Sequence, residues 1–220
     1  LIVSGRTTST NFPVSTGGRY GRGGGWDIVV TKFNTTGTGI VGSVILGGIS
    51  NDGVNIKHKA TAPTGPLSLF QNYGDDARSE VIADAAGNIY IASCTRSDTF
   101  PTTPGVFQTQ KQGDQDAVLL KFAPNMSLAF STLLGGSGDD AAYVVLLEEN
   151  GNILLAGGTS SNNFPGDKSG TVGSTYFGGV ADGFIARISN DGSVLQRTIF
   201  VGTTGVDQIY GIQKDRNGFV

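Results

Sequence analysis

The chain has 220 residues, a formal net charge of −3 and 35 glycines, and only 15% of its residues are charged. It contains no run of like charges, so it lacks the basic surface that nucleic acid or an anionic membrane surface would require. No stretch approaches the roughly 20 apolar residues of a membrane-spanning helix. Many glycines and few charges predict an all-β protein with many tight turns.

Three similar segments follow one another along the chain, and each ends in Phe-Pro after a Thr- or Ser-rich step. Corresponding positions in the second and third copies lie 64 to 67 residues apart, as Pro101 and Pro165 illustrate. The chain therefore consists of three tandem copies of one unit of about 65 residues. The segments are Leu1 to Pro13 (LIVSGRTTSTNFP), Ile89 to Pro101 (IYIASCTRSDTFP) and Ile153 to Pro165 (ILLAGGTSSNNFP).

A second block follows each Phe-Pro, begins with Asp and carries a cation at its sixth position. A carboxylate at the start of a strand can accept hydrogen bonds from backbone amides of the adjacent turn, so we expect these acids to cap turns. The alternative is a ring of acids around a central channel. The blocks are Asp27 to Phe33, Asp116 to Phe122 and Asp182 to Ile188.

Each unit contains four apolar runs of strand length, bounded by turn signals such as Asn150-Gly151. Four antiparallel strands per unit form one blade of a β-propeller. The most uniformly apolar runs, at Ile89 to Ala92 and Ile153 to Ala156, should be covered on both faces by neighbouring blades. In the middle copy the four runs are, in circular order, Tyr143 to Leu147, Ile153 to Gly157, Ala117 to Phe122 and Leu128 to Leu134.

The predicted fold is therefore all-β: one domain over residues 1–220 that forms about three blades of a larger propeller ring, with almost no helix. Propellers have about 4 to 8 blades. Leu1 and Val220 both lie in strand-like apolar runs, so we expect the chain to be a fragment of a longer protein.

One insertion interrupts the repeat. Pro101 follows Pro13 by 88 residues, which places about 24 extra residues between Gly48 and Gly74 if Gly74-Asp75-Asp76 is matched with Gly138-Asp139-Asp140. An insertion in one copy of a regular array is free to carry contacts, so residues 49–73 are predicted to form an interaction loop. Its candidate contact residues are Asn51, Asp52, Lys57, His58, Lys59, Phe70 and Tyr73.

Candidate metal and catalytic groups are few. Calcium prefers several carboxylate oxygens, and the paired acids Asp75, Asp76, Asp139 and Asp140 are its candidates. The alternation of ligands in an EF-hand is absent, and two adjacent Asp side chains point to opposite sides of an extended chain. We therefore expect no metal and no cofactor.

Catalytic signatures are equally sparse. His58 is the only histidine and is expected to be a solvated loop residue, and Cys94 is expected to be a small core residue. No nucleophile elbow or zinc motif is present.

The repeated blocks resemble the SBBP family, the "β-propeller repeat" proteins of bacteria. The resemblance lies in Leu133 to Pro165 (LLGGSGDDAAYVVLLEENGNILLAGGTSSNNFP) and in Thr99 to Phe122 (TFPTTPGVFQTQKQGDQDAVLLKF). It implies an extracytoplasmic, secreted or cell-surface protein, and it carries no shared catalytic residues. The insertion and Gly205-Val206-Asp207 in place of a Gly-Asp-Asp depart from the pattern.

We expect a non-catalytic module that binds a protein or a glycan, or supports a larger assembly, at the bacterial cell surface or envelope. The alternative is a polysaccharide lyase or hydrolase with its site over the propeller channel, because two acids from different blades can lie about 5 to 10 Å apart. Asp116 and Asp182 would then be the acids to test.

Overall fold

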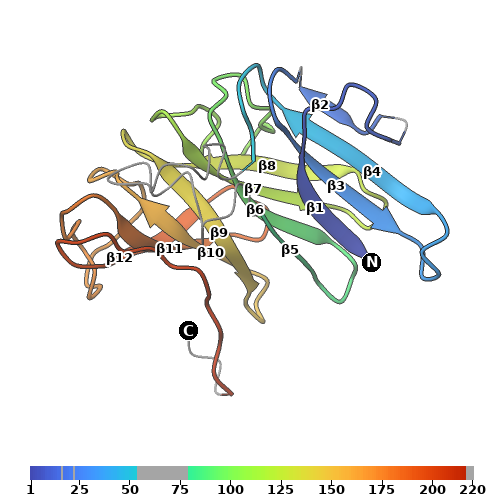
Figure 1. Ribbon diagram of the computed structural model, residues 1–220. Helices are drawn as coiled ribbons and strands as arrows, with labels where there is room; N and C mark the ends of the chain where they lie inside the picture. Colours follow the sequence, from blue (N-terminus) through green and yellow to red (C-terminus); the bar gives the residue numbers. More distant parts are fainter. Residues whose placement is uncertain (16, 22, 54–78, 217–220) are drawn as a thin grey trace.

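The computed structural model describes residues 1–15, 17–21, 23–53 and 79–216 (Figure 1). Within these residues the regular structure is entirely β, with twelve strands in three four-stranded sheets and no helix. The first sheet contains β1 (Ile2–Thr7), β2 (Arg19–Gly21), β3 (Asp27–Phe33) and β4 (Ile40–Gly47). The second contains β5 (Glu80–Ala83), β6 (Ile89–Thr95), β7 (Asp116–Phe122) and β8 (Leu128–Leu134). The third contains β9 (Asp140–Leu147), β10 (Ile153–Thr159), β11 (Asp182–Ile188) and β12 (Leu195–Val201).

The second and third sheets are antiparallel, and their strands lie in the order of the sequence. All four apolar runs predicted for the middle copy are strands, but two belong to the second sheet and two to the third, so their assignment to one four-stranded unit was wrong. Asn150-Gly151 lies in the turn between β9 and β10, as predicted, but the turn is longer than the two-residue turn that Asn-Gly favours, because the N–H of Glu148 donates to Asn152 O at 2.9 Å. Gly151 has a φ of 84°, which glycine adopts without strain, and its N–H donates to Glu148 O at 2.9 Å. The prediction of an all-β chain built from a repeated four-stranded unit is confirmed for these two copies.

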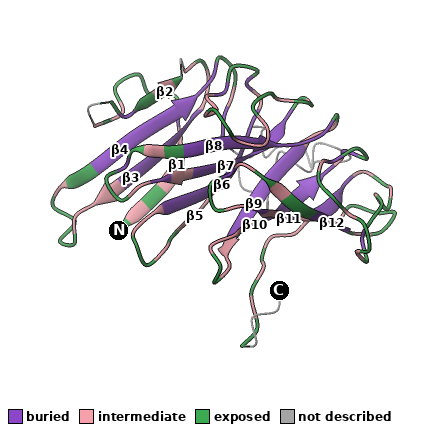
Figure 2. Ribbon diagram, turned by 180° about the vertical axis from the view of Figure 1, so that it is seen from behind, coloured by how far each residue is buried: buried purple, intermediate pink, exposed green. Residues whose placement is uncertain are grey.

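The middle strand β6 has every residue buried, as does β10 (Figure 2). In β6, Ile89 and Ile91 face the first sheet, whereas Tyr90 and Ala92 face the third, and each pair belongs to a separate hydrophobic cluster. Side chains on successive residues of a strand point to opposite faces, so a strand between two packed sheets has no polar side. The expectation that these runs are covered on both faces is confirmed for β6.

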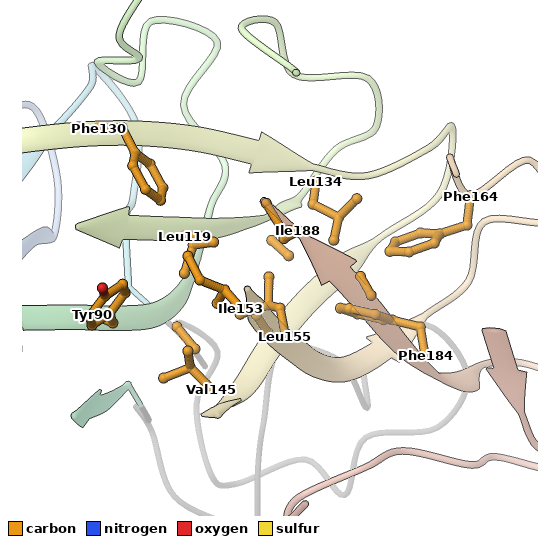
Figure 3. Packing of buried hydrophobic residues seen from close by; sticks show 14 of the residues in the cluster. Tyr90, Leu119, Phe130, Leu134, Val145, Ile153, Leu155, Phe164, Phe184 and Ile188 are labelled. Atoms are coloured by element: carbon orange, nitrogen blue, oxygen red, sulfur yellow. The ribbon is translucent and has the colours of Figure 1, made fainter. Parts of the chain in front are cut away.

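Phenylalanines of the Phe-Pro pairs enter these clusters. Phe164 packs against Phe184, with ring centroids 4.5 Å apart, in the cluster between the second and third sheets (Figure 3). Phe100 occupies the equivalent position between the first and second sheets. Phe12 is only half-buried, because none of the described residues places a sheet on that side of the first sheet. In the second and third copies this ring therefore packs between neighbouring sheets.

The cation at the sixth position of the Asp blocks links neighbouring sheets at their rims. The Lys32 ammonium donates to Pro124 O of the second sheet at 2.8 Å, and Lys121 donates to Asn190 O of the third at 3.0 Å. Arg187, in the equivalent position of the third sheet, instead forms a two-bond ion pair with Glu148 of its own sheet, at 2.6 and 2.9 Å.

The first sheet differs from the expected four-stranded antiparallel unit. Its order is β1-β3-β4-β2, so β1 is an edge strand, whereas its equivalents β6 and β10 are interior strands. The short strand β2 pairs with β4 in parallel and lies on the opposite edge. The described residues therefore supply three strands of the repeat unit and one additional outer strand here.

The position of the insertion differs from the sequence prediction. Asp52 bridges to Thr95 as Asp140 pairs with Thr159, so Asp52 is the equivalent of Asp140, 88 residues before it. Glu80 lies opposite Ala92 as Val144 lies opposite Ala156, so Glu80 is the equivalent of Val144, only 64 residues before it. The extra residues therefore enter after Gly53 and end before Ser79, inside the first strand of the second unit. Matching Gly74-Asp75-Asp76 with Gly138-Asp139-Asp140 in the sequence misplaced this boundary. Asp76 lies 64 residues before Asp140, which is the length of the repeat, and Asp52 lies 88 residues before it, which is the offset between the first two copies.

A truncation tests the packing between sheets. Phe164→Ala removes a buried ring, and such changes lower the free energy of unfolding by about 3 to 5 kcal/mol. Phe177→Ala is the matched control, because Phe177 is 41% exposed. Urea denaturation followed by fluorescence or circular dichroism measures both. A loss at Phe164 no larger than that at Phe177 would contradict the assigned packing.

Candidate functional site: the loop edge

The long connections of the repeat gather at one edge of the sheets. In the second sheet, β6 ends at Thr95 opposite Asp116 at the start of β7, and β8 ends at Leu134 opposite Ala117. In the third sheet, Thr159 lies opposite both Asp140 and Asp182. The connections 96–115, 135–139 and 160–181 therefore leave the sheets at the same side, and we call this side the loop edge (Figure 1).

The acid that begins the third strand holds the preceding loop. Asp116 accepts hydrogen bonds from the backbone N–H groups of Gln112 and Gly113, both at 3.1 Å, and from the Gln108 side chain at 2.7 Å. Asp182 accepts one from the N–H of Phe177 at 2.7 Å. The predicted capping of turns is confirmed for both residues. Neither carboxylate is exposed to solvent.

A second acid begins the first strand and holds the turn that leads into it. Asp140 accepts the N–H of Gly136 and the hydroxyl of Ser161, both at 2.8 Å. Asp52 accepts the N–H of Gly48 at 2.7 Å, the hydroxyl of Ser97 at 3.1 Å and the hydroxyl of Thr95. Sequence reasoning missed this role of Asp52. The signal that could have found it is the constant 88-residue spacing to Asp140.

The third-strand acid of one sheet and the first-strand acid of the next lie on either side of a glycine. A Cβ atom on Gly135 would lie 2.5 Å from Asp116 Cγ and 2.8 Å from Asp140 Oδ2. On Gly47 it would lie 1.7 Å from Asp27 Oδ1 and 3.0 Å from Asp52 Oδ2. No side chain fits there, which explains the glycine at the end of β4 and directly after β8.

Burial shifts the protonation of these acids. Desolvation raises the pKa of Asp140 to about 7, with a smaller upward contribution from the charge of Asp116, although hydrogen bonds from Thr159, Gly136 and Ser161 oppose the rise. Desolvation likewise raises the pKa of Asp52 to about 6. The pKa values of Asp27, Asp116 and Asp182 are raised for the same first reason. The loop edge therefore contains buried acids that bind protons more readily than ordinary carboxyl groups.

The calcium candidates do not form a chelate in the described residues. Asp140 is fully buried, and its Oδ2 accepts the N–H of Gly136, so this N–H occupies a position where a metal ion bound to that oxygen would lie. Asp139 is half-buried beside it, and Asp75 and Asp76 lie outside the described residues. No three His, Cys, Asp or Glu side chains within the described ranges come together to hold a metal ion.

Of the predicted contact residues of the insertion, only Asn51 and Asp52 lie within the described residues. Asp52 is wholly buried, so it cannot be the surface contact that was predicted, because its carboxylate is used to hold the turn. Asn51 is half-buried, and its side-chain oxygen accepts the N–H of Trp26 at 3.1 Å. The remaining candidates, Lys57, His58, Lys59, Phe70 and Tyr73, lie outside the described residues.

A hollow of about 600 Å³ opens at the loop edge between the second and third sheets. None of the described residues that line it carries a charged side chain. Gln112 and Asn163 are exposed at its walls, and Phe107 contributes a half-buried ring. Its remaining lining is Gln108, Gly135, Gly136, Pro165, Gly166, Ser193, Val194 and Leu195.

A smaller hollow of about 280 Å³, between the first and second sheets, is charged. Lys111, whose side chain is 9% exposed, pairs with Asp98 at 3.0 Å and donates to the carbonyl oxygens of Gly113 and Asp114. Arg96 and Asp114 complete its charged lining, so positive and negative groups are balanced there.

The single thiol is shielded from solvent. Cys94 is fully buried, and desolvation raises its pKa well above that of a free cysteine. A thiol in this state is not a nucleophile, which is consistent with the predicted packing role.

Comparison with models of known protein families gives no match for this chain, and a comparison with curated proteins gives none either. The resemblance to the SBBP family therefore remains a prediction. The part of the chain that the structure describes contains no helix long and apolar enough to cross a membrane.

The raised pKa of Asp140 predicts how stability depends on pH. Between pH 3.8, the ordinary value, and about 7, the folded protein holds a proton that the unfolded chain releases. The free energy of unfolding therefore falls as pH rises through this interval, by about 1 kcal/mol for each pKa unit of the shift. Asp140→Asn keeps the neutral form at every pH and should flatten the dependence.

The control is Glu149→Gln, which removes one charge at an exposed position of the same sheet. Urea denaturation from pH 4 to 8 supplies the slopes. A slope equally steep in wild type and Asp140→Asn would show that Asp140 is not the titrating group.

Proposed function

We propose that the three sheets are blades of a β-propeller and that the protein is a non-catalytic, extracytoplasmic binding module. Two neighbouring clusters of buried side chains, each built from facing sides of consecutive sheets, support the blade arrangement. Four-stranded units that pack face to face in chain order are the building plan of propellers. A secreted or cell-surface location rests on the resemblance of the repeated blocks to bacterial SBBP proteins.

The binding surface in this proposal is the 600 Å³ hollow, and its neutral lining is the observation that carries the proposal. The amide groups of Gln112 and Asn163 can donate and accept hydrogen bonds, and Phe107 offers an apolar ring. A neutral glycan presents hydroxyl groups together with apolar C–H faces, which matches this combination. An uncharged polar segment of a protein is the other ligand of this chemistry.

Hydrogen bonds to the buried Asp116 carboxylate hold the loops around the hollow in place. Gln108 donates to Asp116 at 2.7 Å and accepts the N–H of Gly135 at 3.2 Å, while the backbone of Gln112 donates to the same carboxylate. A site on loops fixed by buried acceptors loses little conformational entropy when a ligand binds. The acids then act as supports, and they are not needed for chemistry on the ligand.

Filling the hollow tests the proposal. Gln112→Trp places a bulky side chain in it, and Gln110→Trp makes the same change at a neighbouring exposed residue that does not line it. Binding to an array of neutral glycans and to envelope proteins of bacteria should be lost with Gln112→Trp and kept with Gln110→Trp. Equal binding by both variants would contradict the assignment of the site.

A separate assay addresses the enzymatic alternative. Release of products from a polysaccharide panel by the wild-type chain, lost in Asp116→Asn and Asp182→Asn variants that still fold, would overturn the non-catalytic assignment. Unchanged polysaccharides in the presence of binding would support it.

A further inference from the structure

The side chain of Asn163, at the wall of the 600 Å³ hollow, has an amide nitrogen that is free to donate. Its side-chain oxygen accepts the backbone N–H and the hydroxyl of Ser137, both at 2.9 Å. A backbone N–H can only donate, so the atom that it meets must be the oxygen. Among the described residues, none accepts a hydrogen bond from the nitrogen. Asn163 therefore presents a donor to a molecule in the hollow.

Gln112 presents the opposite group. Its side-chain nitrogen lies 3.4 Å from Gln110 O, which can only accept, so its side-chain oxygen is the atom without a partner in the described ranges. The third amide side chain of the hollow, Gln108, is fully used: its nitrogen donates to Asp116 and its oxygen accepts the N–H of Gly135. The amide side chains of the hollow thus present one donor and one acceptor.

The donor and the acceptor are held on either side of the turn after β8. A Cβ atom on Gly136 would lie 2.6 Å from Asn163 Oδ1, so the Asn163 amide lies directly against this glycine. A Cβ atom on Gly135 would lie 2.5 Å from Asp116 Cγ, and Asp116 Oδ2 accepts the backbone N–H of Gln112 at 3.1 Å. Two successive glycines therefore lie between the residues that carry the two groups.

The rest of the lining supplies apolar contact. Phe107 and Leu195 are half-buried and pack against the hydrophobic cluster between the second and third sheets. The N–H of Phe107 donates to Gly192 O at 3.0 Å, which fixes the backbone that carries the ring. Pro165 and Val194 add further apolar surface. A ligand of the hollow thus meets a donor, an acceptor and apolar groups.

The repeat does not need these two amides for its fold. In the second copy, Thr99 takes the place of Asn163, and its hydroxyl accepts the corresponding N–H of the preceding turn at 3.1 Å. In the third copy, Gly178 takes the place of Gln112, and its backbone N–H likewise donates to the acid that begins the third strand. A hydroxyl and a bare backbone perform the structural roles, so the free amide atoms are available for a ligand.

We propose that the hollow binds an N-acetylhexosamine unit of a glycan, with Asn163 Nδ2 donating to the acetamido carbonyl oxygen and Gln112 Oε1 accepting the acetamido N–H. This assignment rests on the proposed function of the hollow as a site for neutral glycans. An acetamido group carries a carbonyl oxygen, an N–H and a methyl group, which match the donor, the acceptor and the apolar lining. The Phe107 ring favours a sugar over a peptide, because a sugar ring presents its C–H groups as a flat apolar face.

Two trisaccharides test the acetamido group directly. Triacetylchitotriose and cellotriose have the same linkages, but cellotriose carries a hydroxyl group in place of each acetamido group. The chain should bind triacetylchitotriose roughly tenfold more tightly or better, because a hydroxyl group supplies neither the carbonyl oxygen nor the methyl group. Isothermal titration calorimetry measures both dissociation constants.

Variants of the wall test the assigned atoms. Asn163→Asp keeps the oxygen that accepts the N–H of Ser137 but replaces the donor nitrogen by an acceptor, so binding of triacetylchitotriose should weaken roughly tenfold or more. Asn162→Asp is the matched control, because it adds the same charge at an exposed neighbour that does not line the hollow. Gln112→Met removes the acceptor at similar length and should weaken binding as well. Circular dichroism verifies that each variant is folded.

The outcomes separate this assignment from the proposed function. Equal affinity for the two trisaccharides, or equal binding by Asn163→Asp and Asn162→Asp, overturns the acetamido site and leaves a neutral glycan site in place. A chain that binds neither trisaccharide nor any other neutral glycan overturns both. Binding of an uncharged peptide in the hollow without binding of any sugar overturns the acetamido site and assigns the hollow to a protein ligand.

Discussion

A buried aspartate, Asp52 before the second sheet and Asp140 before the third, fixes where one sheet ends and the next begins. The N–H of Asp140 binds Gln115 O of the second sheet, while its carboxylate binds the turn at Gly136 and the hydroxyl of Ser161 in the third. A buried carboxylate is unfavourable unless it is well hydrogen-bonded, so these donors must be present together. These bonds hold the connection from Leu134 through Gly135 into β9, where the second and third sheets pack against each other.

The same constraint sorts residues along each strand. Near the loop edge the acids leave no room for a side chain, so a glycine ends β4 and directly follows β8. In the middle, β6 is covered on both faces and is apolar throughout. At the far rim, Lys121 reaches a carbonyl oxygen of the neighbouring sheet. A polar anchor at each end of an apolar strand sets both the register of the strand and the position of the next sheet.

Sequence reasoning recovered what repeats locally. Apolar runs, Asn-Gly turns and the spacing of Phe-Pro predicted the strands and the length of the repeat, because these features depend on a few neighbouring residues. It failed where two segments of the sequence could each supply the acid that begins the first strand. Asp52 and Asp76 both lie at a repeat distance from Asp140, and the choice depends on the contacts of Asp52 with Thr95 and Ser97. The hollow at Gln112 and Asn163 could not be predicted from the sequence either, because its walls are formed by loops of two different sheets.

The position of the insertion follows from which contacts a unit must keep. The first strand of the second sheet keeps Asp52 at its start and Glu80 to Ala83 beside β6, and the chain is interrupted only between these two parts. The first part holds the turn after Gly48, and the second pairs with β6, so both anchors survive. The entropic cost of closing a loop grows only slowly with its length, so extra residues between two fixed anchors cost little stability. An insertion at the loop edge itself would instead separate Gly48 from Asp52 and remove the acceptor on which the packing of the first and second sheets depends.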